Sequence, residues 1–163
     1  MLRIVTILVL IAVKLAFGCP QWLADPDVPG ILRAMAYPLF HVNIFHLAAN
    51  GLSFWVMFRP GRRQAGRDLL TGYAISCLVF PLASTPVAGI SNLLYAVIGM
   101  RTPGRFWTMR SWQTVMVVAL AMSLLPGVSG LTHAASFAAG AAIAAVRRYI
   151  SMIDYEIGKG IGR

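Results

Sequence analysis

The sequence predicts an all-α, polytopic membrane protein, built as one bundle of six transmembrane helices with a short fourth helix that starts mid-membrane. Composition is the first reason: 58% of the 163 residues are hydrophobic and 12% are charged, whereas a soluble domain has about 25% charged residues. Apolar runs of helical length then follow one another, separated by Pro, Gly or Arg. The basic residues gather between these runs, as they do in membrane proteins. We expect one domain over residues 1–163.

The first apolar run, residues 2–19, nearly supplies the 20 or so residues that a membrane-crossing helix needs. Its basic start and the small residues at positions 16 and 18 also resemble a secretory signal peptide. Against that reading, Lys14 interrupts the apolar stretch just before the possible cleavage site, and further apolar segments follow. We therefore interpret the run as a retained first helix, with Lys14 extending toward the outer interface.

The remaining elements are placed by Pro, Gly and Arg breaks. Residues 20–37 are expected to form an interfacial loop, and residues 151–163 a short cytoplasmic tail. The other helices are expected at residues 40–58, 69–84, 91–101, 112–125 and 132–150. The fourth helix covers only about half of a hydrocarbon core about 30 Å thick. Its first residue, Ser91, should therefore lie near mid-membrane.

Charge sets the predicted topology. With six spans, one side of the membrane carries the following basic residues: Arg3, Arg59, Arg62, Arg63, Arg67, Arg101, Arg105, Arg110, Arg147, Arg148, Lys159 and Arg163. Only Lys14 and Arg33 fall on the other side. Because basic residues favour the cytoplasmic side, the sequence predicts a multi-pass protein of the cell membrane, the bacterial inner membrane, with both termini in the cytoplasm. The lipid bilayer is then the expected surrounding, and the net charge of +9 does not indicate nucleic acid.

Cysteine usage indicates neither a metal site nor a disulfide framework. The chain has two cysteines, Cys19 and Cys77, without zinc-site spacing. Cys77 lies inside an apolar run, so we expect two separate thiols and no cofactor.

Polar residues inside apolar segments carry the functional information, because each costs free energy unless it is paired or functional. His46 and Asn50 are four residues apart and share one helix face. His41 is about 140° away from His46 around such a helix and should face the preceding loop. Ser91 opens the short helix, and His133 opens the last one.

Taken singly, each residue has an ordinary structural explanation. A serine in a membrane helix usually bonds a carbonyl one turn back, and an isolated histidine usually closes a contact between helices. Three histidines could also bind zinc, but the different directions of His41 and His46 argue against convergence.

Together, the residues can form a catalytic set. A nucleophilic serine needs a base within hydrogen-bond reach and donors for the oxyanion that it creates. Small residues at positions 136, 140 and 144 would let the last helix approach the fourth closely. His133 could then reach Ser91, Tyr95 could pack on the imidazole, and His46 and Asn50 could donate to an oxyanion.

No acidic residue is placed to complete a triad, so a Ser-His dyad is the most that the sequence can build. The five carboxylates are Asp25, Asp27, Asp68, Asp154 and Glu156, all expected outside the apolar segments. Their placement also excludes an aspartyl intramembrane protease. No H-E-x-x-H zinc motif is present.

At these residues the chain resembles the rhomboid intramembrane serine proteases. The run from His41 to Asn50 matches the family motif H-x4-H-x3-N, and His133 with Gly140 matches H-x6-G. The motif G-x-S-x3-Y-x3-G is matched by Gly89, Ser91, Tyr95 and Gly99. The ordered set covers most of the chain, which would be a minimal rhomboid-like bundle.

The resemblance implies roles for these residues. Ser91 would be the nucleophile and His133 the general base and acid, while His46, Asn50 and the Ser91 amide would form the oxyanion hole. His41 would be structural, and Arg33 would match the arginine of the family's first loop. The implied activity is hydrolysis of a peptide bond in a transmembrane segment of a single-pass membrane protein, which enters between the second and fifth helices.

Three positions depart from the family pattern. Asn92 replaces the usual glycine after the serine and would crowd the oxyanion region, while Ser136 and Leu32 replace a glycine and a tryptophan. Three alternatives therefore stay open: a catalytically inactive rhomboid-like protein that binds or chaperones membrane segments, a rhomboid-type C-terminal sorting peptidase, and a histidine-based metal or haem protein. The substrate and the oligomeric state cannot be read from the sequence.

Overall fold

The computed structural model describes residues 1–58, 64–83, 87–101 and 129–161, and every regular element in these ranges is helical. The α-helices are α1 (Leu2–Phe17), α2 (Gly30–Ala36), α3 (Ile44–Met57), α4 (Ala65–Val79), α5 (Ser91–Arg101) and α7 (Gly130–Ile161). Single 3-10 turns are η1 (Gln21–Leu23), η2 (Tyr37–Leu39) and η3 (Phe80–Leu82). The predicted all-helical character is confirmed for these ranges.

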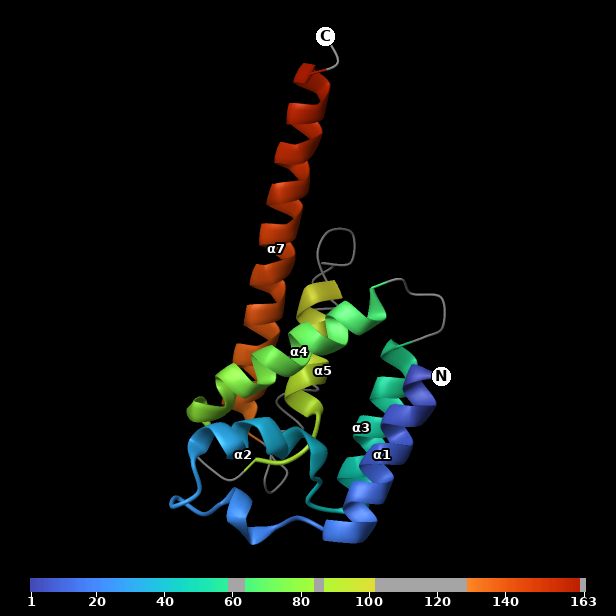
Figure 1. Cartoon of the computed structure of the whole chain (residues 1–163), viewed down its shortest axis with the longest axis vertical. Helices are drawn as coiled ribbons and strands as arrows, with labels where there is room; N and C mark the ends of the chain where they lie inside the picture. The colour runs from blue at the N-terminus through green and yellow to red at the C-terminus, as the bar shows by residue number, and fades with distance from the viewer. Residues whose placement is uncertain (59–63, 84–86, 102–128, 162–163) are drawn as a thin grey trace.

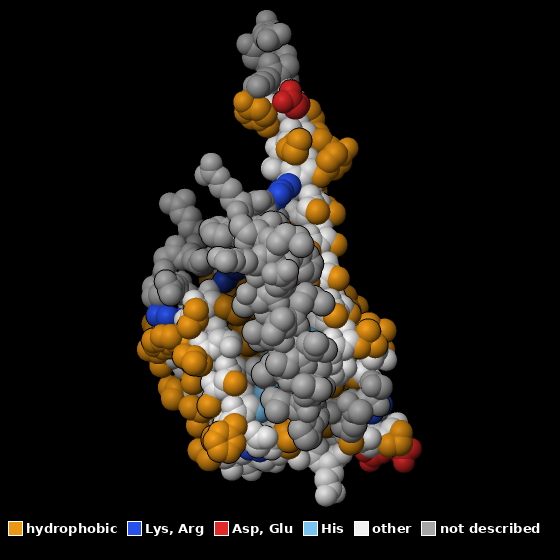
Figure 2. All heavy atoms as spheres, turned by 180° about the vertical axis from the view of Figure 1, so that it is seen from behind, with side chains coloured by type: hydrophobic (Ala, Val, Ile, Leu, Met, Phe, Trp, Pro, Cys, Tyr) orange, Lys and Arg blue, Asp and Glu red, His pale blue; other side chains and the backbone are white. Residues whose placement is uncertain are grey.

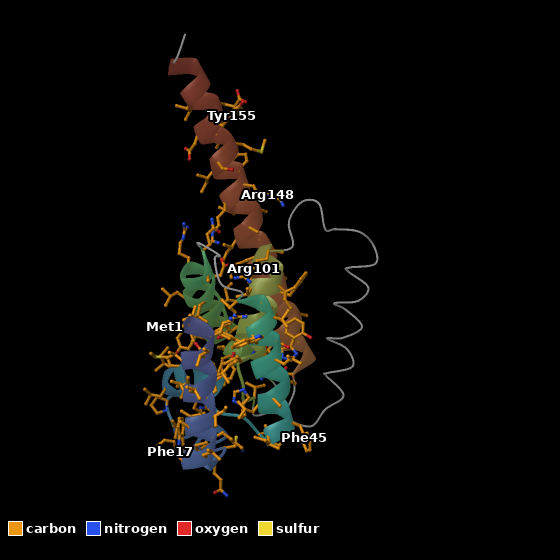
Figure 3. The ribbon with its side chains drawn as sticks, turned by 90° about the vertical axis from the view of Figure 1, so that its right-hand side faces the viewer. Met1, Phe17, Phe45, Arg101, Arg148 and Tyr155 are labelled. Carbon is orange, nitrogen blue, oxygen red and sulfur yellow. The ribbon has the colours of Figure 1, made fainter. Side chains whose placement is uncertain are left out.

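The helices form two packed groups (Figure 1). In one, α1 and α3 lie side by side; Phe17 at the end of α1 and Phe45 near the start of α3 lie at the same end of the molecule (Figure 3). In the other, α4 crosses the pair formed by α5 and α7, and α5 makes its most extensive contacts with α7. The far part of α7, with Arg148 and Tyr155, extends well beyond Arg101 at the end of α5 (Figure 3).

The predicted six-helix transmembrane bundle is contradicted. Among the described helices, none combines the length and the apolar character that crossing a bilayer requires. The helices α1, α3, α4 and α5 have 16, 14, 15 and 11 residues, which is short of the roughly 20 residues needed. The 32-residue α7 is long enough, but histidine, arginine and acidic residues interrupt its apolar sequence.

The same finding contradicts the predicted multi-pass localisation with both termini in the cytoplasm, because that topology requires helices that cross the bilayer. Two of the basic residues that were interpreted as topology signals have local partners instead. Arg101 Nη2 lies 2.8 Å from Asp68 Oδ2, and Arg147 Nη1 lies 3.9 Å from Asp68 Oδ1. Lys14 also bonds locally: its Nζ donates to the carbonyls of His41 and Val42 at 2.8 and 3.0 Å.

Several helix limits differ from the prediction for local reasons. The second predicted helix starts four residues late, because Asn43 Oδ1 accepts a hydrogen bond from His46 N and caps α3. The expected loop over 20–37 contains η1 and α2. The last helix does not stop at residue 150 but runs to Ile161, so the predicted tail is mostly helical. The predicted helix over 112–125 lies outside the described residues.

The apolar core joins α1, α3 and α5. It consists of Leu10, Leu47, Phe54, Phe58, Ile90, Leu93, Leu94, Val97 and Met100. By contrast, the outer face of α1 leaves Ile4, Leu8 and Leu15 exposed, and hydrophobic side chains cover that edge of the molecule in Figure 2. The short helix α5 is therefore the buried centre around which the other helices pack.

The contact between α5 and α7 depends on two glycines. A Cβ atom on Gly99 would lie less than 3.0 Å from the Phe137 carbonyl oxygen, and one on Gly140 would lie equally close to the Ala96 carbonyl. Real Cβ atoms essentially never come that close, so only glycine fits at either position. The predicted close approach of the last helix through small residues is confirmed.

Candidate active site

The first residues of α5 and α7 meet at Ser91 and His133. Ser91 Oγ lies 2.8 Å from His133 Nε2, within hydrogen-bond distance. Both side chains are buried, with exposed fractions of 8% and 2%. The contact joins residues 42 positions apart, and it is the contact on which the predicted dyad depends.

A turn that requires glycine places Ser91 at the start of α5. Gly89 has φ +105°, a conformation that side chains rarely adopt. Its N–H donates to the carbonyl of Tyr37, 3.0 Å away. The turn thus delivers Ser91 to the first position of the helix, where its side chain faces α7.

His133 is positioned by its helix start and by an aromatic ring. Ser129 Oγ accepts a hydrogen bond from Thr132 N at 3.4 Å, and the Thr132 hydroxyl donates to the Ser129 carbonyl at 3.0 Å. The Tyr95 ring stacks on the imidazole with 4.4 Å between the centroids and 23° between the planes. Tyr95 therefore restricts the ring of His133, as predicted from its place one turn after Ser91.

Two polar side chains of α3 border the same turn. A Cβ atom on Gly89 would lie 2.9 Å from Asn50 Nδ2 and 3.2 Å from His46 Nε2. Both nitrogens are buried and have no hydrogen-bond partner in the part of the chain that the structure describes. Buried donors without partners are rare and need an explanation. A developing oxyanion beside Ser91 would provide one for both.

Burial keeps the imidazoles neutral. It lowers the pKa of His133 from its ordinary 6.5 to about 4, with a smaller contribution from nearby His46, and it also lowers the pKa of His46. A neutral His133 can accept the serine proton at Nε2 if its own proton is on Nδ1. Nδ1 has no partner among the described residues, so the pair is a dyad and lacks the carboxylate of a triad.

His41 lies closer to His46 than the sequence indicated. The predicted separation assumed one helix through both residues, but α3 begins only at Ile44. The two rings meet edge to face with 5.4 Å between their centroids, and His41 is fully buried. Even so, no three His, Cys, Asp or Glu side chains within the described ranges are arranged to hold a metal ion.

The side chain of Asn92 is held by Tyr37. Its Nδ2 donates to the hydroxyl of Tyr37 at 2.9 Å, and the residue is 2% exposed. The other unusual residue on these helices, Ser136, is completely buried in α7. The expectation that Asn92 crowds the oxyanion region stays a prediction; the structure shows its amide bonded to Tyr37.

Sequence reasoning missed Tyr37. This tyrosine is 1% exposed and bonds the serine turn through its carbonyl and Asn92 through its hydroxyl. The available signal was a buried amide without an expected partner, since Asn92 in an apolar helix needs one. A tyrosine in the preceding semi-apolar loop was a suitable candidate.

A groove of about 390 Å³ between α3 and α5 reaches Ser91. It is lined by Ala49, Asn50, Leu52, Ser53, Val56, Met57, Ser91, Leu94, Tyr95 and Ile98. Most of these side chains are apolar, and the two polar site residues lie together at Asn50 and Ser91. The groove can therefore hold an apolar chain against the serine.

The predicted fifth helix, one side of the expected substrate entrance, lies outside the described residues. Cys19 and Cys77 are both free thiols. Comparison of the chain with protein-family models, with curated protein sequences and with solved structures finds no match.

Proposed function

We propose that the protein is a serine-type endopeptidase of the rhomboid type. Its Ser91-His133 dyad would hydrolyse a peptide bond in an apolar helical segment of the kind that anchors single-pass membrane proteins. The observation that carries the proposal is the 2.8 Å contact between Ser91 Oγ and His133 Nε2. It is supported by the two unpartnered donors of His46 and Asn50 next to the serine turn.

In the proposed reaction, Ser91 Oγ attacks the peptide carbonyl carbon while His133 Nε2 takes the hydroxyl proton. The negative charge on the carbonyl oxygen is stabilised by Asn50 Nδ2, by His46 Nε2–H and by the positive end of α5. The C–N bond then breaks, and His133 returns the proton to the leaving amine. Water repeats the sequence on the acyl-serine and releases a carboxylic acid and free Ser91.

The lining of the groove supports an apolar substrate. Leu52, Val56 and Leu94 border the space in front of Ser91. Burying apolar side chains there would contribute about 25 cal/mol for each Å² removed from water. A polar peptide would lose its hydration at this surface without gaining hydrogen bonds, so the proposed substrate is an apolar segment unwound at the cleavage site.

The inactive alternative rested on Asn92 as an obstruction. The Asn92 amide donates to the Tyr37 hydroxyl, and this bond weighs against that alternative.

The test uses a reporter with an apolar helical segment between two soluble domains, together with labelling by a fluorophosphonate. We expect the wild type to cleave the reporter and to be labelled at Ser91. Ser91→Ala and His133→Ala should each reduce cleavage by about a thousandfold or more, because a dyad fails when either member is removed.

Ser53→Ala is the matched control, because Ser53 lines the same groove but is exposed on α3 and is not bonded to a histidine. It should cleave and label like the wild type. Equal labelling of the wild type and Ser91→Ala would contradict the nucleophile. Labelling of Ser91 without any reporter cleavage would contradict the peptidase activity.

A further inference from the structure

The hydrogen bonds of Tyr37 reach both ends of the segment that carries Ser91. Before the serine, the Tyr37 carbonyl accepts from Gly89 N at 3.0 Å. After the serine, the Tyr37 hydroxyl accepts from Asn92 Nδ2 at 2.9 Å. One residue of η2 therefore bonds the backbone before the proposed nucleophile and the side chain of the residue after it.

The hydroxyl of Tyr37 is itself anchored to α4. It donates to the carbonyl of Ser76 at 2.9 Å, and the Tyr37 ring packs on Phe80 with 5.1 Å between the centroids. Tyr37, Ser76 and Asn92 have exposed fractions of 1%, 0% and 2%. Burial also raises the pKa of Tyr37 to about 12, so the hydroxyl keeps its proton and its bond to Ser76 at any ordinary pH.

The serine turn lies between this anchor and the oxyanion donors. Gly89, which donates to Tyr37, also lies against Asn50 and His46, so that a Cβ atom on it would lie 2.9 Å from the nearest atom of each. A shift of the turn by a few tenths of an ångström would change the distance between the Ser91 amide and these donors. Oxyanion stabilisation depends on distances of this kind.

The buried side-chain amide of Asn92 lowers the stability of the fold. Its Oδ1 is buried without a partner among the described residues, and an unsatisfied buried acceptor destabilises a fold. An apolar or small residue would avoid that cost at position 92. The hydrogen bond to Tyr37 gives the asparagine a role that offsets it.

We propose that Tyr37 and Asn92 form a positioning pair that fixes the Ser91 turn against the oxyanion donors of α3. The pair acts through the backbone of residues 89–92 and touches no substrate. The inference rests on the proposed function, since it concerns the rate at which Ser91 reacts. It explains how an asparagine can follow the nucleophile without obstructing the site.

The test measures fluorophosphonate labelling of Ser91, in which an Oγ–P bond forms, fluoride leaves and His133 takes the proton. Tyr37→Phe keeps the ring, its packing on Phe80 and the carbonyl bond to Gly89, but it removes the hydroxyl. We expect the maximal labelling rate to fall about tenfold. The reagent concentration at half-maximal rate should stay within about twofold, because the groove is unchanged.

Tyr73→Phe is the matched control: its hydroxyl also donates to a backbone carbonyl, that of Met35 at 2.6 Å, but it makes no hydrogen bond to residues 89–92. It should label at the wild-type rate. Asn92→Gly removes the same hydrogen bond and should also lower the maximal rate, so the double variant Tyr37→Phe with Asn92→Gly should label at about the rate of either single variant.

Three outcomes would overturn the pair. In the first, Tyr37→Phe lowers the thermal midpoint of unfolding but leaves the maximal labelling rate unchanged; Tyr37 would then have a structural role only. In the second, the effects of Tyr37→Phe and Asn92→Gly on the labelling rate are additive; the two residues would then not be coupled. A wild type that is not labelled above Ser91→Ala overturns the proposed function and the pair together, whereas the first two outcomes overturn the pair alone.

Discussion

In the proposed reaction, burial sets the protonation of His133 beside Ser91. His133 is 2% exposed, and its Nε2 lies 2.8 Å from the serine hydroxyl. Because the pKa of His133 is lowered from 6.5 to about 4, the imidazole is neutral and able to accept a proton at neutral pH. It is also a weaker base than an ordinary histidine, so the proposed reaction depends strongly on oxyanion stabilisation.

The lowered pKa predicts the pH dependence of labelling. A general base works only in its unprotonated form. The rate at which a fluorophosphonate labels Ser91 should therefore be constant above pH 6.5 and should fall to half near pH 4. A half-maximal rate at or above pH 6.5 would contradict the buried environment of His133.

This measurement needs a folding control in the same pH range. His41 and His133 both have a pKa of about 4 in the folded protein and 6.5 as ordinary imidazoles. Between these values the unfolded chain binds more protons, so the free energy of unfolding decreases as the pH falls from 6.5 to 4. Tryptophan fluorescence at each pH separates a loss of fold from protonation of the base.

At the level of elements, helix starts decide which side chains meet. The cap by Asn43 begins α3 at Ile44 and leaves His41 in the preceding turn. The hydrophobic pattern alone extended the helix back through His41, and it therefore placed the two imidazoles on different faces. One capping hydrogen bond of 2.8 Å reverses that conclusion.

The contact between α5 and α7 predicts a severe effect for one methyl group. In Gly99→Ala the new Cβ would overlap the backbone of α7 at Phe137, and backbone atoms cannot move aside without separating the helices. We expect the free energy of unfolding to fall by about 1–3 kcal/mol, as in other overpacked cores. Labelling of the folded protein at Ser91 should also decrease, because the same two helices hold the dyad.

Gly51→Ala is the matched control for this substitution. It is the same change inside the helix α3, but beyond the adjoining residues of its own helix no described atom lies within 4 Å of the new Cβ. Alanine has a higher helix propensity than glycine, so this variant should be as stable as the wild type or up to about 1 kcal/mol more stable. Equal free energies of unfolding for Gly99→Ala and Gly51→Ala would contradict the tight packing of α5 on α7.

At the scale of the whole molecule, one ion-pair cluster ties four helices together. Asp68 of α4, 5% exposed, binds Arg101 at the end of α5 at 2.8 Å and lies 3.9 Å from Arg147 of α7. Arg101 also donates to the carbonyl of Met57 at the end of α3. The Arg147 guanidinium donates to the Thr71 hydroxyl at 3.3 Å.

Removing the carboxylate charge should destabilise the whole bundle. Asp68→Asn keeps the size of the side chain but leaves two guanidinium groups without their counter-charge. Removing one partner of a largely buried ion pair lowers the free energy of unfolding by about 3 kcal/mol. Chemical denaturation measures this change. Asp154→Asn, on the exposed far part of α7, is the control and should stay within about 0.5 kcal/mol of the wild type. Equal stability of the two variants would contradict the role of the cluster.

Some of this arrangement was already determined by the sequence. Spacing within one helix put Ser91 and Tyr95 on the same face, because residues one turn apart share a helix face, and the ordered family motifs added His133. The α5 limits at Ser91 and Arg101 follow from the breaks at Gly89 and Pro103. Small residues on the last helix predicted a close approach, since packing distance depends on side-chain size.

Other features were decided only by tertiary structure. Composition predicted six membrane spans, but the length of each helix depends on caps and packing, and no described helix has the length and apolar character to span. Tyr37 and Asn92 meet across 55 positions, and Asp68 binds arginines 33 and 79 positions later. Sequence spacing fixes neighbours within one helix, whereas the partner of a buried amide or carboxylate depends on how separate helices pack.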